Sequence, residues 1–502
     1  MPARARRALP DASEQETEWF DTFRTFVVEK FCGIIDGRMW RDLVLKVVVS
    51  EPMLLHATLA FTSTSTSSGR SAGQSKVFSL QQYGRAASQL KKCLGSSHNV
   101  NRNVLLMTCL MLTCCALMRD SYEEASTHLQ GGAALLSQHK SEYSGLENYI
   151  VRAFRCLDTS VSLFLPTRPP HPLWSLHVPP ELNAARDIGT VRVDVLRDKL
   201  EQWISEVLCL KRDVEFSTKS KADELWEGYP LNLQSRWLSL REAAKQWRAA
   251  YDFFVASSLT AMLDAKAKRD AEIGAAVMLI NHIPAHIMLE ACLADGYECV
   301  YDRYLSGFKE VVDLATVVAP HYMSKISAQG RDLDSAAFSL DVGILPALYY
   351  TVMKCRKPDL RRRAVTLLST IQHRSGPWSP MVTARFAERV LRVEEDLAAS
   401  LRPGHMITEA ADIPEAARLH ASFIRTAEGR HNKDIRRGDF KKEEDWLAYE
   451  KCVSVAESAA KIGASDQLLF DVGSWHKALT CYGKEPGRKE SMRLTEKRSG
   501  AV

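Results

Sequence analysis

Apolar residues fill one stretch in the first third of the chain almost completely. From Val104 to Met118, every residue except Thr108 and Thr113 is apolar, sulfur-containing or alanine. At about 1.5 Å per residue, this stretch covers little over 20 Å, which is less than a bilayer core of about 30 Å. The pattern therefore predicts a helix that protein surrounds on all sides. Leu106, Leu110 and Leu117 are expected to be almost fully buried.

The residues that follow predict a second helix, packed against the first. Arg119-Asp120-Ser121 interrupts the apolar run, and Asp120 or Ser121 can cap the next helix. An apolar stripe at helical spacing then consists of Ala125, Leu129, Ala133 and Leu136. Gly131 and Gly132 lie inside this helix at a cost of about 1 kcal/mol each relative to alanine, which indicates that a neighbouring helix approaches closely. The two helices are predicted to form an antiparallel hairpin at the centre of the core.

Helical periodicity recurs along most of the chain, whereas the period-two alternation of strands is almost absent. Further helices are predicted at Trp40 to Val49, from Pro52 onward, and at Glu142 to Leu165, Val191 to Leu263, Ala275 to Leu293, Tyr297 to Val318, Ile344 to Met353, Pro358 to Ile371, Met381 to Leu401 and Ile413 to Ala427. The Ser/Thr-rich stretch Thr62 to Ser75 predicts a flexible loop. The predicted fold class is all-α, a multi-helix array of antiparallel helical hairpins.

Composition divides the chain into five parts. Residues 1–17 are polar and basic, which predicts a disordered N-terminus. Residues 18–165 and 181–427 carry the helical patterns and predict two helical halves. Between them, the prolines of residues 166–180 favour an extended connector. Residues 428–502 are highly charged and predict a partly disordered tail.

Overall composition and charge predict an ordinary globular protein inside the cell. Hydrophobic residues make up 46% and charged residues 25% of the chain. A net charge of +5 over 502 residues does not by itself imply a nucleic-acid partner. The first residues lack the apolar segment of a secretory signal, and no run reaches the roughly 18 apolar residues of a membrane span. Without such a signal, the 12 cysteines are expected to be reduced thiols.

Several segments, in the order in which they occur, resemble the middle regulatory domain of fungal binuclear zinc-cluster transcription factors. They are EWFDTFR (Glu18 to Arg24), SEPMLLHATLAF (Ser50 to Phe61), FSLQQYGRAASQL (Phe78 to Leu90), RDSYEEASTHLQGGAALL (Arg119 to Leu136) and FSLDVGILPALYYTVMKCRKPDLRRRAVTLLSTIQHRSGPWSP (Phe338 to Pro380). The resemblance covers roughly Trp19 to Arg425, which is most of the chain.

This resemblance raises the question of zinc. A binuclear cluster needs cysteine thiolates arranged in Cys-x-x-Cys units, because two metals share bridging sulfurs. No two cysteines in this sequence are three residues apart. Cys114 and Cys115 are neighbours on the predicted buried helix, and Cys292 and Cys299 are isolated. We therefore predict core packing for Cys114 and Cys115 and no zinc cluster within the sequence.

Gly69-Arg70-Ser71-Ala72-Gly73 matches the Gly-x-Ser-x-Gly pattern of serine hydrolases. That motif works when a strand delivers the serine into a strained turn ahead of a helix. Here a Ser/Thr run precedes it and no parallel sheet is predicted. The pattern therefore indicates a solvated loop and no catalytic serine.

His282, His286 and Glu290 are spaced four residues apart and could share one helix face, as metal ligands do. Zinc proteases of the His-Glu-x-x-His type carry a glutamate after the first histidine, where this chain has Ile283. Pro284 also disturbs a helix between the two histidines. We predict ordinary packing for these residues and no metal site, with His282 as a polar residue at a kink.

The densest basic cluster contains Lys354, Arg356, Lys357 and Arg361 to Arg363. It lacks the interleaved aromatic residues of a single-strand nucleic-acid patch. Pro358-Asp359 suits the first turn of a helix, where an acid complements the helix dipole. The cluster is therefore interpreted as the solvated start of a helix. The resemblance likewise implies that this pattern belongs to the regulatory domain and not to a DNA contact.

The residues alone predict a soluble all-α protein with no catalytic, cofactor-binding or metal-binding set. The resemblance implies a transcriptional regulator, with a pathway-specific role, that acts in the nucleus through protein partners. Those partners include a zinc-cluster DNA-binding relative, so DNA is reached only indirectly, and a homo- or heterodimer is consistent with this role. No membrane partner is expected, and the alternative location is the cytoplasm. Two alternatives stay open: a helical interaction or ligand-sensing module without a direct role in transcription, and an enzyme that reuses the fold.

Overall fold

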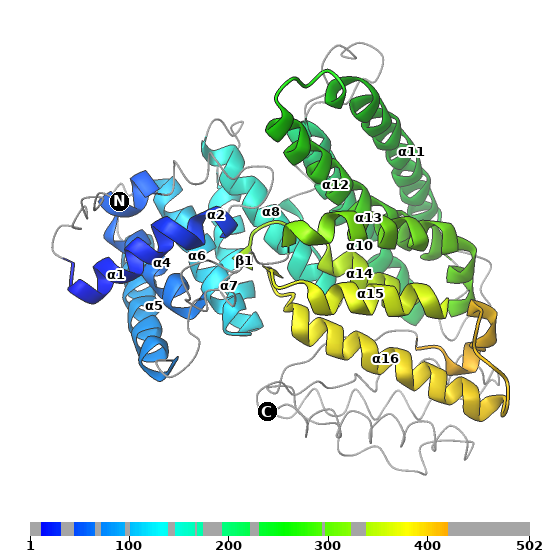
Figure 1. The fold of residues 1–502 in the computed structure, drawn as a ribbon. Helices are drawn as coiled ribbons and strands as arrows, with labels where there is room; N and C mark the ends of the chain where they lie inside the picture. Colours follow the sequence, from blue (N-terminus) through cyan, green and yellow to red (C-terminus); the bar gives the residue numbers. More distant parts are fainter. Residues whose placement is uncertain are drawn as a thin grey trace.

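The computed structural model describes residues 12–31, 45–65, 72–95, 101–138, 146–165, 168–173, 193–220, 230–293, 297–322 and 338–419 (Figure 1). Helices make up nearly all of the regular structure in these ranges, so the predicted all-α class is confirmed for them. Neighbouring helices along the chain pack as pairs, which confirms the predicted array of helical hairpins. These pairs are α4–α5, α6–α7, α10–α11, α12–α13 and α14–α15.

The first hydrophobic core lies in the N-terminal part of the chain. Its helices are α1 (Glu14–Thr22), α2 (Val28–Phe31), α4 (Pro52–Ser65), α5 (Ala72–Gly95), α6 (Arg102–Met118), α7 (Tyr122–Ser137) and α8 (Leu146–Phe164). α6 is central, because it packs against α4, α5, α7 and α8. Every residue from Val104 to Leu117 is buried, with Leu106, Leu110 and Leu117 no more than 1% exposed. The prediction of a helix surrounded by protein is confirmed.

The second hydrophobic core is larger and lies beside the first (Figure 1). Its helices are α10 (Val193–Ser220), α11 (Leu231–Phe253), α12 (Ala265–Ala291), α13 (Leu305–Tyr322), α14 (Leu345–Lys354), α15 (Pro358–Thr370) and α16 (Pro380–Leu401). α12 is long and apolar enough, by length and composition alone, to cross a membrane. However, 67% of its most apolar window is buried inside the protein, and the helix packs against α10, α11, α13 and α14. It is therefore a core helix.

The turn between α6 and α7 differs from its predicted form. Ser121 precedes α7, but its side chain makes no capping hydrogen bond. Asp120 instead adopts a left-handed backbone with φ of 59°, and its carboxylate accepts a 2.6 Å hydrogen bond from Arg374, far along the chain. The close approach predicted from the two glycines holds for Gly132, where an added Cβ would lie 2.3 Å from Cε1 of Phe154. An added Cβ on Gly131 would meet no atom within 4 Å.

A small parallel sheet joins the two cores. β1 (Phe338–Ser339) pairs with β2 (Arg374–Ser375). Phe338 packs edge-on against Phe61 in the first core, with ring centroids 5.4 Å apart. After β2, the indole of Trp378 donates a 3.2 Å hydrogen bond to the carbonyl of Ser160 in α8. The late segment therefore connects both cores, although it follows the first core by more than a hundred residues.

The predicted flexible loop from Thr62 to Ser75 is wrong at both ends. Thr62 to Ser65 continue α4, and Ala72 to Ser75 begin α5. The hydroxyl groups of Thr58, Thr62 and Ser63 each donate a 2.8 Å hydrogen bond to a carbonyl four residues earlier. These polar groups are thereby paired inside the helix and can be buried. Residues 66–71 lie outside the described ranges.

The predicted last core helix, Ile413 to Ala427, is also wrong over its described part. Two 3₁₀ turns, Ala410–Asp412 and Glu415–Ala417, occupy this region instead. The Asp412 carboxylate accepts hydrogen bonds from the N–H groups of Thr408 and Glu409, which favours a turn over a helix. Residues 420–427 lie outside the described ranges, as does the predicted disordered tail, residues 428–502.

Other predicted boundaries move by a few residues. The Tyr297 to Val318 helix is a 3₁₀ helix, Glu298–Tyr304, followed by α13. α1 begins at Glu14, within the segment predicted to be disordered, because Ser13 and Glu16 form a capping box. In the Pro-rich connector, residues 168–173 are described, and Arg168 there forms a 2.5 Å ion pair with Asp158 of α8.

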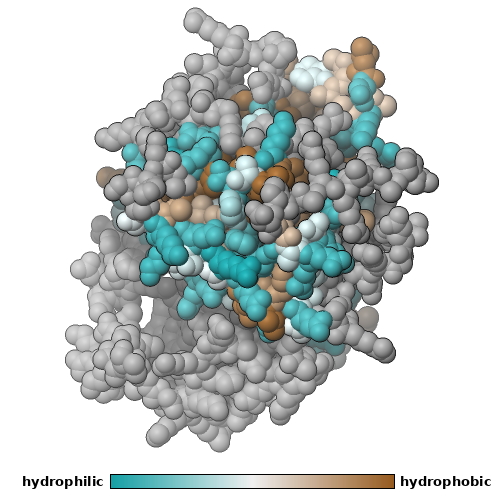
Figure 2. Space-filling model, turned by 90° about the vertical axis from the view of Figure 1, so that its left-hand side faces the viewer, coloured by the Kyte–Doolittle hydropathy of each residue, from teal (hydrophilic) through white to brown (hydrophobic). Residues whose placement is uncertain are grey.

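The surface of the first core is mixed in character. Hydrophilic side chains cover much of the described face shown in Figure 2, with apolar side chains between them. Val77, Leu80 and Leu94 of α5 are about half exposed, while Phe78 and Leu90 of the same helix are buried. One face of α5 thus covers the core and the other faces solvent.

Candidate functional site

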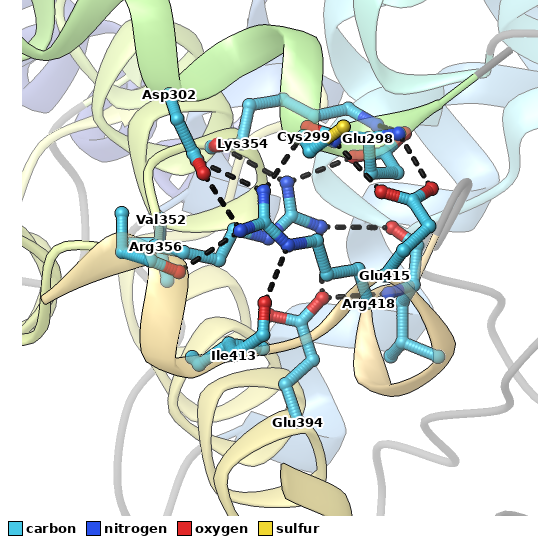
Figure 3. A network of polar contacts seen from close by, with 12 residues as sticks. Glu298, Cys299, Asp302, Val352, Lys354, Arg356, Glu394, Ile413, Glu415 and Arg418 are labelled. Carbon is cyan, nitrogen blue, oxygen red and sulfur yellow. Dashed lines mark hydrogen bonds and ion pairs between the residues drawn. The ribbon is translucent and has the colours of Figure 1, made fainter. Parts of the chain in front are cut away.

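Two arginines of the basic cluster around α15, predicted to be the solvated start of a helix, belong to a network of buried ion pairs (Figure 3). Arg356 is fully buried, and its guanidinium lies 2.8 Å from carboxylate oxygens of both Glu298 and Glu394. Arg361, also fully buried, lies 2.8 Å from the second oxygen of Glu394. The prediction of a solvated cluster is therefore wrong for these two arginines. Each is neutralised by an acid from another segment.

The same network holds the segment that follows α16 against the residues that precede α13. Arg418 contacts both carboxylate oxygens of Asp302, at 2.8 and 2.7 Å. Glu415 accepts hydrogen bonds of 2.7 and 2.8 Å from the N–H groups of Glu298 and Cys299 (Figure 3). The 3₁₀ turns after residue 409 are thereby held against the 3₁₀ helix that precedes α13.

Electrostatics favour full ionisation at Glu394. Burial alone would raise the pKa of its carboxyl group, but the guanidinium groups of Arg356 and Arg361 outweigh burial and hold that pKa below its ordinary value. At Lys354 burial dominates over the attraction of Glu298, so the pKa of its ammonium group is lowered. Buried charges of this kind persist only when they are paired and hydrogen-bonded. The network therefore has a structural role.

The remaining arginines of the cluster are also paired. Arg362 reaches Glu395 at 2.8 Å, and Arg363 reaches Asp313 at 2.8 Å. Both arginines are about half exposed, and their charges are compensated by these acids. The cluster therefore does not present a concentrated face for phosphate groups, in agreement with the interpretation that it is no DNA contact.

A groove of about 520 Å³ lies between α11, α12 and the start of α13. Its lining residues are Ala244, Lys245, Arg248, Ala249, Asp252, His282, Ile283, His286, Ile287, Tyr304, Ser306 and Gly307. Its volume falls within the range of about 300–1,000 Å³ typical of small-molecule sites. Two of the histidines singled out from the sequence thus line a groove.

His282 is only 6% exposed and stacks against two tryptophans. Its ring centroid lies 5.1 Å from that of Trp203 and 4.6 Å from that of Trp247. Neither ring nitrogen has a hydrogen-bond partner among the described residues. Burial, together with the nearby His286 and Arg248, lowers the pKa of this imidazole to about 3. The ring is therefore neutral at ordinary pH.

The three candidate metal ligands on α12 do share a helix face, but they do not form a ligand set. His286 stacks 5.9 Å from His282, and its Nε2 lies 3.9 Å from Glu290. Glu290 is engaged by the guanidinium of Arg241 at 2.5 Å. Across the described ranges, no group of three His, Cys, Asp or Glu residues could hold a metal ion. α12 runs through Pro284 without interruption.

Sequence reasoning did not identify the groove. The α12 spacing placed His282 and His286 on one face, but nothing in the pattern indicated that Trp203 and Trp247 would flank one of them. Trp203 lies on α10 and Trp247 on α11. Only the packing of these helices against α12 brings the two tryptophans next to His282. Arg248 was likewise not singled out.

The remaining residues considered from the sequence are the serine of the hydrolase-like motif and four cysteines. Ser71 lies outside the described ranges, while the described segment before it is the helix α4, where the hydrolase motif would need a strand. Cys114 and Cys115 are fully buried, and burial raises the pKa of both thiols. Cys292 is partly buried, and Cys299 is exposed. The predicted core role is confirmed for Cys114 and Cys115.

Comparison with known proteins agrees with the resemblance noted from the sequence. Residues 19–261 match a family model described as "Fungal specific transcription factor domain", which is a family of transcription factors and not of enzymes. A stretch of 79 residues is 39% identical to the aspercryptin biosynthesis cluster-specific transcription regulator of Emericella nidulans. That stretch covers 16% of this chain and only 13% of the relative. No solved structure matches the chain.

The matched region includes the first core and continues into the second. Its last helices, α10 and α11, pack against α12, which lies beyond the match. For example, the indole of Trp237 in α11 donates a 2.9 Å hydrogen bond to the carbonyl of Leu289 in α12. The folded unit therefore extends past residue 261. Over residues 19–261, this chain is therefore similar to proteins that carry a fungal specific transcription factor domain.

Proposed function

We propose that this chain is a transcriptional regulator that acts in the nucleus through protein partners and controls a single pathway. The observation that carries the proposal is the family match over residues 19–261. The pathway-specific role is supported by the relative, whose name describes a cluster-specific regulator of aspercryptin biosynthesis. The similarity to that protein is confined to 79 residues, so no particular pathway follows from it.

In this proposal, sequence-specific DNA contact comes from a partner, such as a zinc-cluster relative with which the chain forms a heterodimer. The 12 cysteines include no Cys-x-x-Cys unit from which a zinc cluster could be built. The densest basic segment is compensated by Glu298, Glu394 and neighbouring acids. Residual binding to DNA would therefore be independent of sequence and would weaken steeply with salt.

One experiment measures whether the chain itself binds DNA in a sequence-specific way. The purified chain is titrated against duplexes of a regulated promoter and against scrambled duplexes, at two salt concentrations. The expected result is equal, salt-sensitive binding to both. A preference of about a thousandfold or more, typical of specific binders, would contradict the proposed dependence on a partner.

A second experiment measures the cellular role. Deletion of the gene is expected to change transcripts of one pathway, and the tagged protein is expected in the nucleus. Promoter occupancy should disappear when the DNA-binding partner is deleted. A cytoplasmic protein whose deletion leaves transcripts unchanged would favour the alternative of an interaction module without a direct role in transcription.

A further inference from the structure

The groove between α11, α12 and α13 carries more hydrogen-bond donors than acceptors. α11 contributes the cations Lys245 and Arg248, and Tyr304 and Ser306 add hydroxyl groups. The single carboxylate among the lining residues, Asp252, already accepts a 2.9 Å hydrogen bond from Arg248. Arg248 uses Nε for this bond and Lys245 lies 3.7 Å from Glu242, so a negatively charged ligand would bind the terminal nitrogens of Arg248 in competition with these acids.

The opposite wall of the groove is apolar and closely packed. It contains Ile283 and Ile287 of α12, which face the start of α13 at Gly307. An added Cβ at Gly307 would lie 3.2 Å from Cγ2 of Ile283 and 3.3 Å from Cδ1 of Ile287, so glycine lets α13 approach α12 closely. Ile283 and Ile287 are 8% and 2% exposed, so this wall offers a narrow apolar strip to the hydrocarbon part of a ligand.

His282 adds a polar group with unused hydrogen-bonding capacity to the groove. A neutral imidazole has one donor and one acceptor, and at His282 neither has a partner among the described residues. A buried polar group of this kind is unfavourable unless something pairs with it. Its two nitrogens are covered, so a ligand would reach them only after side chains of the groove move. Among the lining side chains, those of Arg248 and His286 are 42% and 40% exposed. Side-chain rearrangements of this size are common on binding.

We propose that this groove binds a small organic acid, whose carboxylate is held by Arg248 and His282 and whose apolar body lies against Ile283 and Ile287. A guanidinium binds a carboxylate through two parallel hydrogen bonds, and the imidazole N–H of His282 supplies a third donor. Lys245 adds positive charge at the rim of the groove. The proposal concerns a binding site alone and does not rest on the proposed role in transcription.

The test uses 4-phenylbutyrate as the probe and measures its binding to the full chain by calorimetry. The uncharged 4-phenylbutanol, which has the same apolar body, serves as the ligand control. The acid should bind and the alcohol should bind at least about tenfold more weakly, because charge-assisted hydrogen bonds are lost. Competition by other carboxylates would then identify better ligands.

Two variants test the location of the site. Arg248→Gln removes the guanidinium from an exposed i,i+4 pair and should weaken binding of the acid about tenfold or more. Arg392→Gln is the matched control, since Arg392 forms an exposed i,i+4 pair with Glu388 on α16, outside the groove. Ser306→Trp, at an exposed lining position, should block the groove without disturbing the core.

A third variant tests His282 itself. His282→Phe keeps a flat ring between Trp203 and Trp247 and removes both nitrogens, so binding of the acid should weaken while the fold is retained. Equal affinity for the acid and the alcohol would overturn the proposal. So would the absence of acid binding up to about 10 mM, or acid binding that Arg248→Gln and Ser306→Trp leave unchanged. None of these results depends on the location of the protein in the cell or on its effect on transcripts.

Discussion

Replacement of Glu394 by glutamine tests the role of the buried ion network. Glu394 is fully buried on α16 and contacts Arg356 and Arg361 through separate oxygens, each at 2.8 Å. It also accepts a 2.6 Å hydrogen bond from the N–H of Leu419. Glu394→Gln keeps the shape of the side chain but removes its charge. Arg356 retains Glu298, whereas Arg361 loses its carboxylate partner.

The expected loss of stability is large. Removal of one partner from a buried ion pair typically costs about 3–5 kcal/mol, because a buried charge is left uncompensated. That loss is a substantial part of the roughly 5–15 kcal/mol by which folded proteins are stable. The affected segments are α14, α15, α16 and the turns up to Leu419, so the second core should lose the most.

Denaturant unfolding of the full chain, followed by tryptophan fluorescence, measures this effect. Glu395→Gln is the control, because Glu395 is the next residue on the same helix and pairs with Arg362, which is 56% exposed. Such an exposed pair contributes only about 0–1 kcal/mol. The reasoning would be refuted if the two variants had the same midpoint of unfolding.

Two further measurements identify the cause of the loss. Arg361→Met in the Glu394→Gln background removes the uncompensated cation and should restore part of the lost stability. The pH dependence follows from the lowered pKa of Glu394. Its stabilising contribution should be complete above the unfolded-state pKa, whose ordinary value is 4.5, and should be lost as the pH falls through the folded-state pKa. The variant should therefore lose less stability than the native chain upon acidification.

The first core allows two more predictions, both measured by thermal unfolding. Gly132→Ala should destabilise the chain by about 1–3 kcal/mol, because the new Cβ meets the ring of Phe154, whereas Gly131→Ala, with open space, should stabilise it by up to about 1 kcal/mol. Equal effects of the two changes would contradict the close contact between Gly132 of α7 and Phe154 of α8. Leu110→Ala should cost about 2–5 kcal/mol, while Leu94→Ala, at a 53% exposed position, should have little effect. An unchanged melting temperature for Leu110→Ala would contradict its burial.

The sequence by itself determined the fold class and the centre of the first core. An apolar run interrupted only by two threonines is sufficient to predict that α6 is buried on all sides, because a helix exposes any apolar face that protein does not cover. The stripe from Ala125 to Leu136 similarly predicted the partner helix α7. Cysteine spacing excluded a zinc cluster from these residues, since the geometry of the metal imposes the spacing. In each case, the prediction depends on residues that are close together in the sequence.

Local composition was misleading where polar groups find partners inside a helix or across the fold. Thr62 to Ser65 looked too polar to pack, but their hydroxyl groups are satisfied by the carbonyls of α4. Where the last helix was predicted to begin, the Asp412 carboxylate instead binds the backbone of its own turn. The spacing of apolar residues predicts which face of a helix is buried. It carries no information about which polar atoms form hydrogen bonds.

Only the tertiary structure decided the environment of charged and aromatic side chains. Arg356 and Glu394 are 38 residues apart, and their pairing depends on how α16 packs beside α14 and α15. In the same way, Trp203 and Trp247 reach His282 because α10, α11 and α12 meet in the second core. An ion pair or a groove forms where separate helices converge. A linear sequence records the members of such a site but not their distances, and burial and pKa depend on those distances.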